Sequence, residues 1–126
     1  MGTRYVFLIL TLVTLLFYLP ILANPSIVLE RGNDLEEFFW PIFYFVQQQI
    51  LEHNTFPLWN NLFLSGTPLL PDPQSPLFYP PNIIFLILHI DTAFLASFMF
   101  HSFFGGVGAY LAARHGLGFS TAGSII

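Results

Sequence analysis

The chain has 126 residues, of which 55% are hydrophobic, 18% are aromatic and only 8% are charged, and its formal net charge is −4. Soluble domains carry about 25% charged residues, so this composition excludes an ordinary soluble domain and indicates a membrane protein. The acidic balance offers no basic patch to nucleic acid, and a chain without cysteine has neither disulfides nor thiol chemistry.

Residues 1–24 are expected to form a first transmembrane helix. The run from Tyr5 to Ala23 contains no charged residue over nineteen positions. At about 1.5 Å per residue this length covers a hydrocarbon core of about 30 Å. A cleaved signal peptide is the alternative, but the apolar part of a signal peptide has about 7–15 residues, which favours a retained helix. Pro20 is expected in the last turn of this helix.

Residues 25–81 are expected to form a first extracytoplasmic loop that begins with an amphipathic helix, about 35–54. Glutamine, glutamate, Trp40 and Tyr44 fall on one face at helical spacing, and large apolar side chains populate the other. The pattern predicts a helix lying on the membrane surface, with its aromatic residues in the headgroup layer. Pro41 marks either the first helical turn or a kink.

The segment 56–81 combines seven prolines with many aromatic and aliphatic residues. Proline fixes φ and removes a backbone donor, whereas the large apolar side chains need an apolar cover. The composition therefore predicts a rigid, packed loop rather than a disordered linker.

Residues 82–115 are expected to form a short apolar helix, 82–90, and a second full transmembrane helix, 92–114, with Asp91 as its N-cap. Three glycines in this helix, Gly105, Gly106 and Gly108, permit close helix packing. His101 inside the span is a functional candidate or a neutral hydrogen-bonding group.

Residues 116–126 look like the beginning of a further helix, with Ser120 or Thr121 as its N-cap. So few helical residues cannot cross a membrane or fold alone. We therefore expect residues 1–126 to be the N-terminal part of a longer, polytopic protein.

Charge placement predicts the orientation of the chain in the membrane. Arg4 flanks the first span and Arg114 flanks the second, which puts both of these ends in the cytoplasm. The intervening residues, about 25–81, then lie on the outer side of the cytoplasmic membrane.

Asp34 is the candidate catalytic residue. A carboxylate close to the membrane surface could accept a proton from a hydroxyl that attacks a lipid-linked donor. The alternative is that Asp34 only caps the following helix. No cofactor is implied by the residues; a divalent cation could bind oxygen ligands from Asp34, Glu37 and Asp72, but no ligand spacing requires it.

The loop contributes the candidate substrate-binding residues. Asp72 and Gln74 stand between prolines that could hold them toward a substrate, or they could simply form turns. Trp59, Asn60 and Tyr79 offer aromatic rings and an amide for stacking on a sugar, although Trp and Tyr also anchor proteins at membrane interfaces.

The order of these motifs resembles the N-terminal region of bacterial YfhO-type membrane proteins. The shared motifs lie between Gly32 and Gly118 and read FPLWN, SGTPLL, DPQS and FYPPN in this chain. That family looks like the GT-C class of polytopic, all-α glycosyltransferases, which carry an acidic catalytic residue in the first extracytoplasmic loop.

The resemblance implies a reaction and its partners. A polyprenyl-phosphate-linked sugar would be the donor, a glycan or lipid of the cell envelope would be the acceptor, and Asp34 would be the general base. The reaction would invert the anomeric carbon. By the same similarity Asp72 and Gln74 would shape the site.

Two other functions compete with this one. A non-enzymatic assembly or lipid-handling protein would use the aromatic loop to bind a partner. A transporter would need a discontinuous helix near the bilayer midplane, which residues 82–90 could supply, but the expected spans contain no charged coupling residue.

Overall fold

The computed structural model describes residues 3–24, 27, 32, 34–72 and 77–125. The described chain is mostly helical, and it divides into two compact units. One unit comprises Met1–Asn24 with Phe98–Ile126, and the other comprises Pro25–Ser97. We call them the helix-pair unit and the loop unit.

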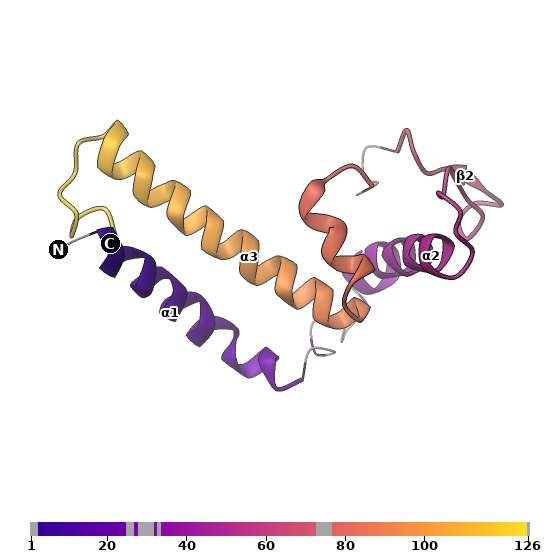
Figure 1. Ribbon diagram of the computed structural model, residues 1–126, viewed down its shortest axis with the longest axis horizontal. Helices are drawn as coiled ribbons and strands as arrows, with labels where there is room; N and C mark the ends of the chain where they lie inside the picture. Colours follow the sequence, from indigo (N-terminus) through magenta and orange to yellow (C-terminus); the bar gives the residue numbers. More distant parts are fainter. Residues whose placement is uncertain (1–2, 25–26, 28–31, 33, 73–76, 126) are drawn as a thin grey trace. The chain divides into compact units, whose positions relative to one another are not determined.

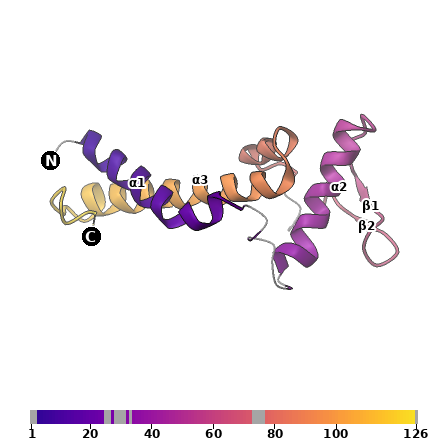
Figure 2. The same cartoon turned by 90° about the horizontal axis from the view of Figure 1, so that it is seen from below.

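The helix-pair unit is built from α1, Thr3–Leu22, and the greater part of α3, Ile90–Leu111. Both helices are long and apolar enough to cross a membrane. They run antiparallel and side by side, so that the start of α1 and the end of α3 lie at the same end of the pair (Figures 1 and 2). This geometry puts the two basic flanks, Arg4 and Arg114, at one end, as the charge pattern predicts.

Small and polar side chains define the contact between these helices. A Cβ on Gly106 would lie 3.3 Å from Leu10 Cδ2, so the absence of a side chain on Gly106 gives Leu10 its place. The hydroxyls of Tyr18 and Ser102 are hydrogen-bonded at 2.8 Å. The prediction of close packing is therefore confirmed at Gly106, whereas Gly105 and Gly108 have no neighbour within 4 Å of an added Cβ.

The outer surface of the helix pair is strongly apolar. Only 6% of the apolar window in α1 and 17% of that in α3 are buried within the protein. Leu8 and Phe17 on α1 and Phe104 on α3 are all more than 60% exposed. An apolar surface that large is favourable in lipid and unfavourable in water.

The chain after α3 turns sharply at the basic end. The π-helical turn η4, Ala112–Gly116, is followed by Gly118 at φ 71°, and Arg114 Nη1 donates to the Phe119 carbonyl at 2.8 Å. Ser120 then accepts the Gly123 N–H on its Oγ at 3.1 Å. Ser120 thus binds a following amide as an N-cap serine would, but residues 121–125 form a turn and not a helix.

The loop unit begins with η2, Leu35–Phe39, a π-helical turn that runs directly into α2, Trp40–Leu51. The Trp40 N–H donates to the Leu35 carbonyl, five residues back. Pro41 explains this widened turn, because its ring has no N–H and clashes with the carbonyl four residues earlier in a regular helix. Pro41 therefore lies in the first turn of α2, one of the two alternatives that the sequence left open.

The apolar face of α2 packs on the proline-rich loop. Ile42 and Val46 form a buried cluster with Leu69, and further side chains surround it, namely Phe38, Phe45, Ile50, Phe63 and Leu77. Pro57 is buried as well. The expected packing is therefore seen at the buried residues Pro57, Asn60 and Leu69, whereas other apolar side chains of the loop are exposed.

Within the loop, β1, Trp59–Asn60, and β2, Thr67–Pro68, pair as a short antiparallel hairpin. Trp59 lies opposite Pro68, and Asn60 lies opposite Thr67. The Leu69 N–H donates to the Leu58 carbonyl at 2.9 Å and continues the pairing by one residue.

The short apolar helix is a 3-10 helix, η3, Pro80–Leu86, rather than a helix over 82–90. Phe85 fixes it to the unit, because its ring packs on Phe43 at 3.9 Å and on Phe94 of α3 at 4.9 Å between centroids. The Gln47 amide donates from Nε2 to the carbonyls of Phe85 at 2.6 Å and Leu88 at 3.0 Å. Gln47, which the sequence places on the polar face of this helix, therefore binds the backbone of η3 and of the residues that follow it.

The start of α3 also differs from the expectation. Asp91 lies inside the first turn of α3 instead of at its N-cap, and its Oδ1 accepts the indole N–H of Trp40 at 3.0 Å. Trp40 in turn stacks on Tyr44, with a centroid distance of 5.0 Å and an interplanar angle of 9°. Trp40 and Gln47 therefore tie α2 to η3 and to the start of α3.

Candidate functional site

Asp34 stands immediately before the π-helical turn, and its carboxylate is exposed. Its backbone is already helical, with φ −54° and ψ −27°, and its side chain makes no capping hydrogen bond. An N-cap side chain usually reaches the free amides from an extended backbone, so Asp34 occupies the N-cap position without the side-chain hydrogen bond of a cap. The Asp34 carboxylate is therefore exposed and accepts no hydrogen bond from the amides of the helix terminus.

Glu36 stabilises the chain ahead of Asp34. Its Oε2 accepts the Gly32 N–H at 2.7 Å, and Gly32 has φ 48°, which suits glycine. Together these two residues bend the chain at the place where Asp34 begins the helix. Glu37 lies beside them with an exposed side chain.

The hairpin separates the predicted roles of Trp59 and Asn60. Asn60 is 1% exposed, and its Oδ1 accepts the Leu62 N–H at 2.9 Å, so it forms the turn of the hairpin. Trp59 is 57% exposed. Its indole lies directly over Gly66, where an added Cβ would be 2.5 Å from Nε1.

Asp72 and Tyr79 lie before and after residues 73–76, which are outside the described residues. Asp72 is half-buried, and Tyr79 is 47% exposed. Gln74 lies outside the described residues, so its expected role stays a prediction.

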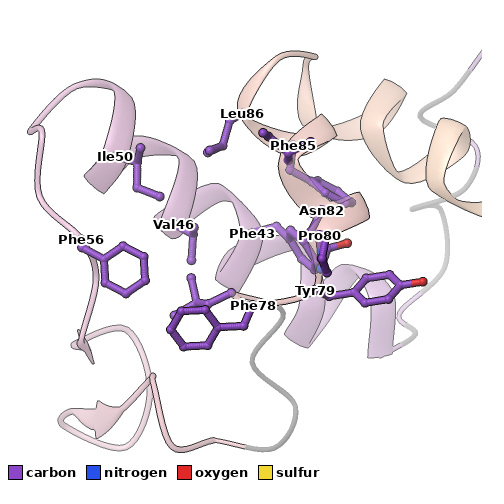
Figure 3. Close-up of a pocket in the computed structure, with 12 residues that line it drawn as sticks. Phe43, Val46, Ile50, Phe56, Phe78, Tyr79, Pro80, Asn82, Phe85 and Leu86 are labelled. Carbon is purple, nitrogen blue, oxygen red and sulfur yellow. The ribbon is translucent and has the colours of Figure 1, made fainter.

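An apolar cavity of about 400 Å³ opens between α2, η3 and the loop, and Figure 3 shows its walls. Phe56 and Phe78 lie near each other at one side, with ring centroids 6.1 Å apart. The ring of Tyr79 extends away from Phe78, with its hydroxyl at the outer end (Figure 3). The lining residues are Phe43, Val46, Ile50, Phe56, Leu77, Phe78, Tyr79, Pro80, Asn82, Ile83, Phe85 and Leu86.

Sequence reasoning missed this cavity. Its walls come from three segments, α2, η3 and the loop. The sequence pattern predicts most of these side chains on a helix face or in the packing of the loop, and not around a common cavity. Of the predicted site residues only Tyr79 lines it; Asp34, Trp59, Asn60 and Asp72 do not. The high density of phenylalanine on α2 and around Phe78 was the signal for an apolar site.

The structure does not form the cation site that oxygen ligands could have made. Among the described residues, no three histidine or acidic side chains approach one another closely enough to hold a metal ion. A cation held jointly by Asp34, Glu37 and Asp72 is therefore excluded as an arrangement of this structure. His89 Nδ1 and Asp91 Oδ2 lie 3.9 Å apart.

The fold defines a mostly helical protein with two helices that are long and apolar enough to cross a membrane, joined by a packed loop unit. Comparison with protein-family models, with curated proteins and with solved structures finds no significant match to the chain. The functional argument therefore depends on the residues themselves and on the resemblance of their motifs.

Proposed function

We propose that the chain is the N-terminal part of a membrane-bound glycosyltransferase of the GT-C kind, with Asp34 as general base. The observation that carries the proposal is the state of Asp34, whose exposed carboxylate makes no capping hydrogen bond. A carboxylate that binds no amide of the helix terminus can accept a proton from a substrate. The resemblance of the motifs between Gly32 and Gly118 is the second support.

The proposed location is the cytoplasmic membrane of a bacterial cell. α1 and α3 would span it, and the loop unit would lie on the outer side, where envelope glycans and lipids are found. The common end of the helix pair, with Arg4 and Arg114, would be cytoplasmic.

The reaction follows from the chemistry of a carboxylate and a lipid-phosphate donor. Asp34 accepts the proton of an acceptor hydroxyl while that oxygen attacks the anomeric carbon of the sugar. The bond between this carbon and the phosphate oxygen breaks, and polyprenyl phosphate leaves as an anion. Attack opposite the leaving group inverts the anomeric configuration.

The other residues take roles that fit their positions. The apolar cavity beside Tyr79 offers a surface for part of the polyprenyl chain, since about 0.8 kcal/mol is gained for each CH₂ removed from water. Trp59 presents an aromatic face for a sugar, while buried Asn60 holds the hairpin that carries it. Asp72 and Gln74 are proposed to shape the sugar site.

The test is the variant Asp34→Asn in the full-length protein, assayed with a radiolabelled polyprenyl-phosphate sugar. Loss of a general base typically lowers the rate about 10²–10⁴-fold, and we expect a loss in this range with normal membrane insertion. The matched control is Glu37→Gln, which removes an exposed carboxylate one turn away and should retain activity. Wild-type turnover by Asp34→Asn would refute the role of this residue as the base, whereas absence of sugar transfer by the unmodified full-length protein would favour a non-enzymatic function.

A further inference from the structure

We propose that the tip of the β1–β2 hairpin inserts into the outer leaflet of the membrane that α1 and α3 cross. Four exposed apolar residues lie on the β1 side of the hairpin: Leu58 immediately before the strand, Trp59 on it, and Leu62 and Leu64 in the tip that follows it. These side chains are 57%, 57%, 56% and 90% exposed, respectively. Leu64, at 90% exposure, has almost no protein around it, and the other three side chains are more than half exposed, so that four of the seven positions from 58 to 64 present apolar surface to the surroundings.

The backbone of the hairpin holds these side chains outward. Phe63 points inward and packs on Phe38, with ring centroids 5.6 Å apart, so its neighbours Leu62 and Leu64 point away from the buried cluster. Leu64 and Ser65 have φ of 49° and 64°, the left-handed region that side chains rarely adopt. Such a conformation is strained for a residue with a side chain and persists only where the surrounding structure imposes it.

Hydrogen bonds impose this conformation. The Asn60 side chain accepts the Leu62 N–H, and the Gly66 N–H donates to the Phe63 carbonyl at 2.7 Å. Leu64 is thus held at the end of a braced turn rather than at the end of a loose loop. A fold that fixes a leucine in this way presents it to an apolar medium.

The lipid bilayer is the proposed partner of these exposed side chains, because α1 and α3 of the same chain would cross it. The segment from Phe56 to Pro71 contains no Asp, Glu, Lys or Arg, so insertion removes no charge from water. Both ends of the loop unit continue into α1 and α3, which confines the unit to the membrane surface once these helices are inserted. Trp59 suits the headgroup layer, and apolar side chains of interfacial segments enter the boundary by about 5–10 Å.

This inference rests on the proposed membrane location but not on the chemistry of Asp34. The 126 residues contain no cysteine, so once any cysteine elsewhere in the full-length protein is replaced, single cysteines can be labelled selectively with a nitroxide. We would reconstitute the full-length protein in phosphatidylcholine vesicles and label Leu64→Cys, Glu52→Cys and Leu12→Cys. Glu52 is exposed at the end of α2, and Leu12 is 57% exposed in the middle of α1.

The measurement compares relaxation of each label by oxygen, which concentrates in lipid, and by a water-soluble nickel chelate. We expect a membrane signature at Leu12 and Leu64 and an aqueous one at Glu52. Failure at Leu12 would refute the membrane location, whereas an aqueous Leu64 with a membrane signature at Leu12 would refute the inserted tip alone. Spin–spin broadening at Leu64 that disappears on dilution with unlabelled protein would instead show pairing of two copies and overturn the proposal.

Trp59 gives a second readout without a substitution in the tip. In full-length protein that carries Trp40→Phe and keeps Trp59 as its single tryptophan, the Trp59 indole should be quenched by brominated lipid, and Leu64→Asp in the same background should reduce this quenching, because a carboxylate is costly to place in lipid. Equal quenching with and without the aspartate would contradict an inserted tip.

Discussion

Gln47 provides the sharpest test of how the loop unit is held together. Its amide donates from Nε2 to the carbonyls of Phe85, at 2.6 Å, and Leu88, at 3.0 Å. Both carbonyls lie at the end of η3, where a helix leaves its last acceptors without partners. Gln47→Met keeps the length of the side chain and removes both donors.

The magnitude follows from the two bonds. Each contributes about 1 kcal/mol net, and a buried carbonyl left without a donor costs about 1–3 kcal/mol. Since Phe85 is buried and Leu88 is half-buried, we expect η3 to lose about 2 kcal/mol of protection against opening. That energy corresponds to about a thirtyfold faster exchange of its amide hydrogens. Gln47→Glu should be worse, because a carboxylate would face two carbonyl oxygens.

Hydrogen exchange of the peptide that covers η3, in the full-length protein in detergent or vesicles, measures this opening. The control is Gln48→Met, because Gln48 is half-buried like its neighbour but forms no side-chain hydrogen bond within the described residues. If Gln47→Met and Gln48→Met exchange alike, the two bonds do not stabilise η3 and the reasoning fails.

Two glycines give further predictions. Gly66→Ala combines φ 115° with a Cβ 2.5 Å from the Trp59 indole, so the hairpin should lose about 2 kcal/mol or more, measured as faster amide exchange over residues 58–69. Gly106→Leu should separate α1 from α3 at Leu10 and destabilise the pair by about 1–3 kcal/mol, measured as a lower unfolding temperature in detergent. The control Gly105→Leu adds a side chain where an added Cβ has no neighbour within 4 Å and should have little effect; equal losses from both leucines would contradict the packing argument.

Elements governed by local pattern could be predicted from the sequence. The uncharged run of α1 specifies its length directly, and the structure has it at Thr3–Leu22. The apolar face of α2 was predicted correctly, since Ile42, Phe43 and Val46 are buried. Both results depend on the pattern of residues within one segment. This pattern is visible without knowledge of what packs against the segment.

Contacts between distant segments could not be predicted in this way. The sequence pattern places Gln47 on the polar face of α2. In the structure its amide donates to the carbonyls of Phe85 and Leu88, which lie 38 and 41 positions away in the sequence. Asn60 was predicted to bind a sugar, but it is only 1% exposed. The hairpin causes this burial, and the neighbouring residues in the sequence do not reveal it. The sequence did carry a signal for the π-helical turn, since Pro41 removes the N–H that a regular helix would need.

The same distant contacts bear on where the proposed base is held. Asp34 begins the helical stretch that continues without interruption into α2, and Trp40 and Gln47 on α2 bind Asp91 and the end of η3. Asp91 lies in the first turn of α3. The helical stretch that begins at Asp34 is therefore held to the start of α3 by the polar contacts of Trp40 and Gln47, and not by the side chain of Asp34. A transferase with a lipid-linked donor needs such a coupling, since the reacting carbon has a fixed depth at the membrane surface and a base displaced by about 1 Å can lose about 10²-fold in rate.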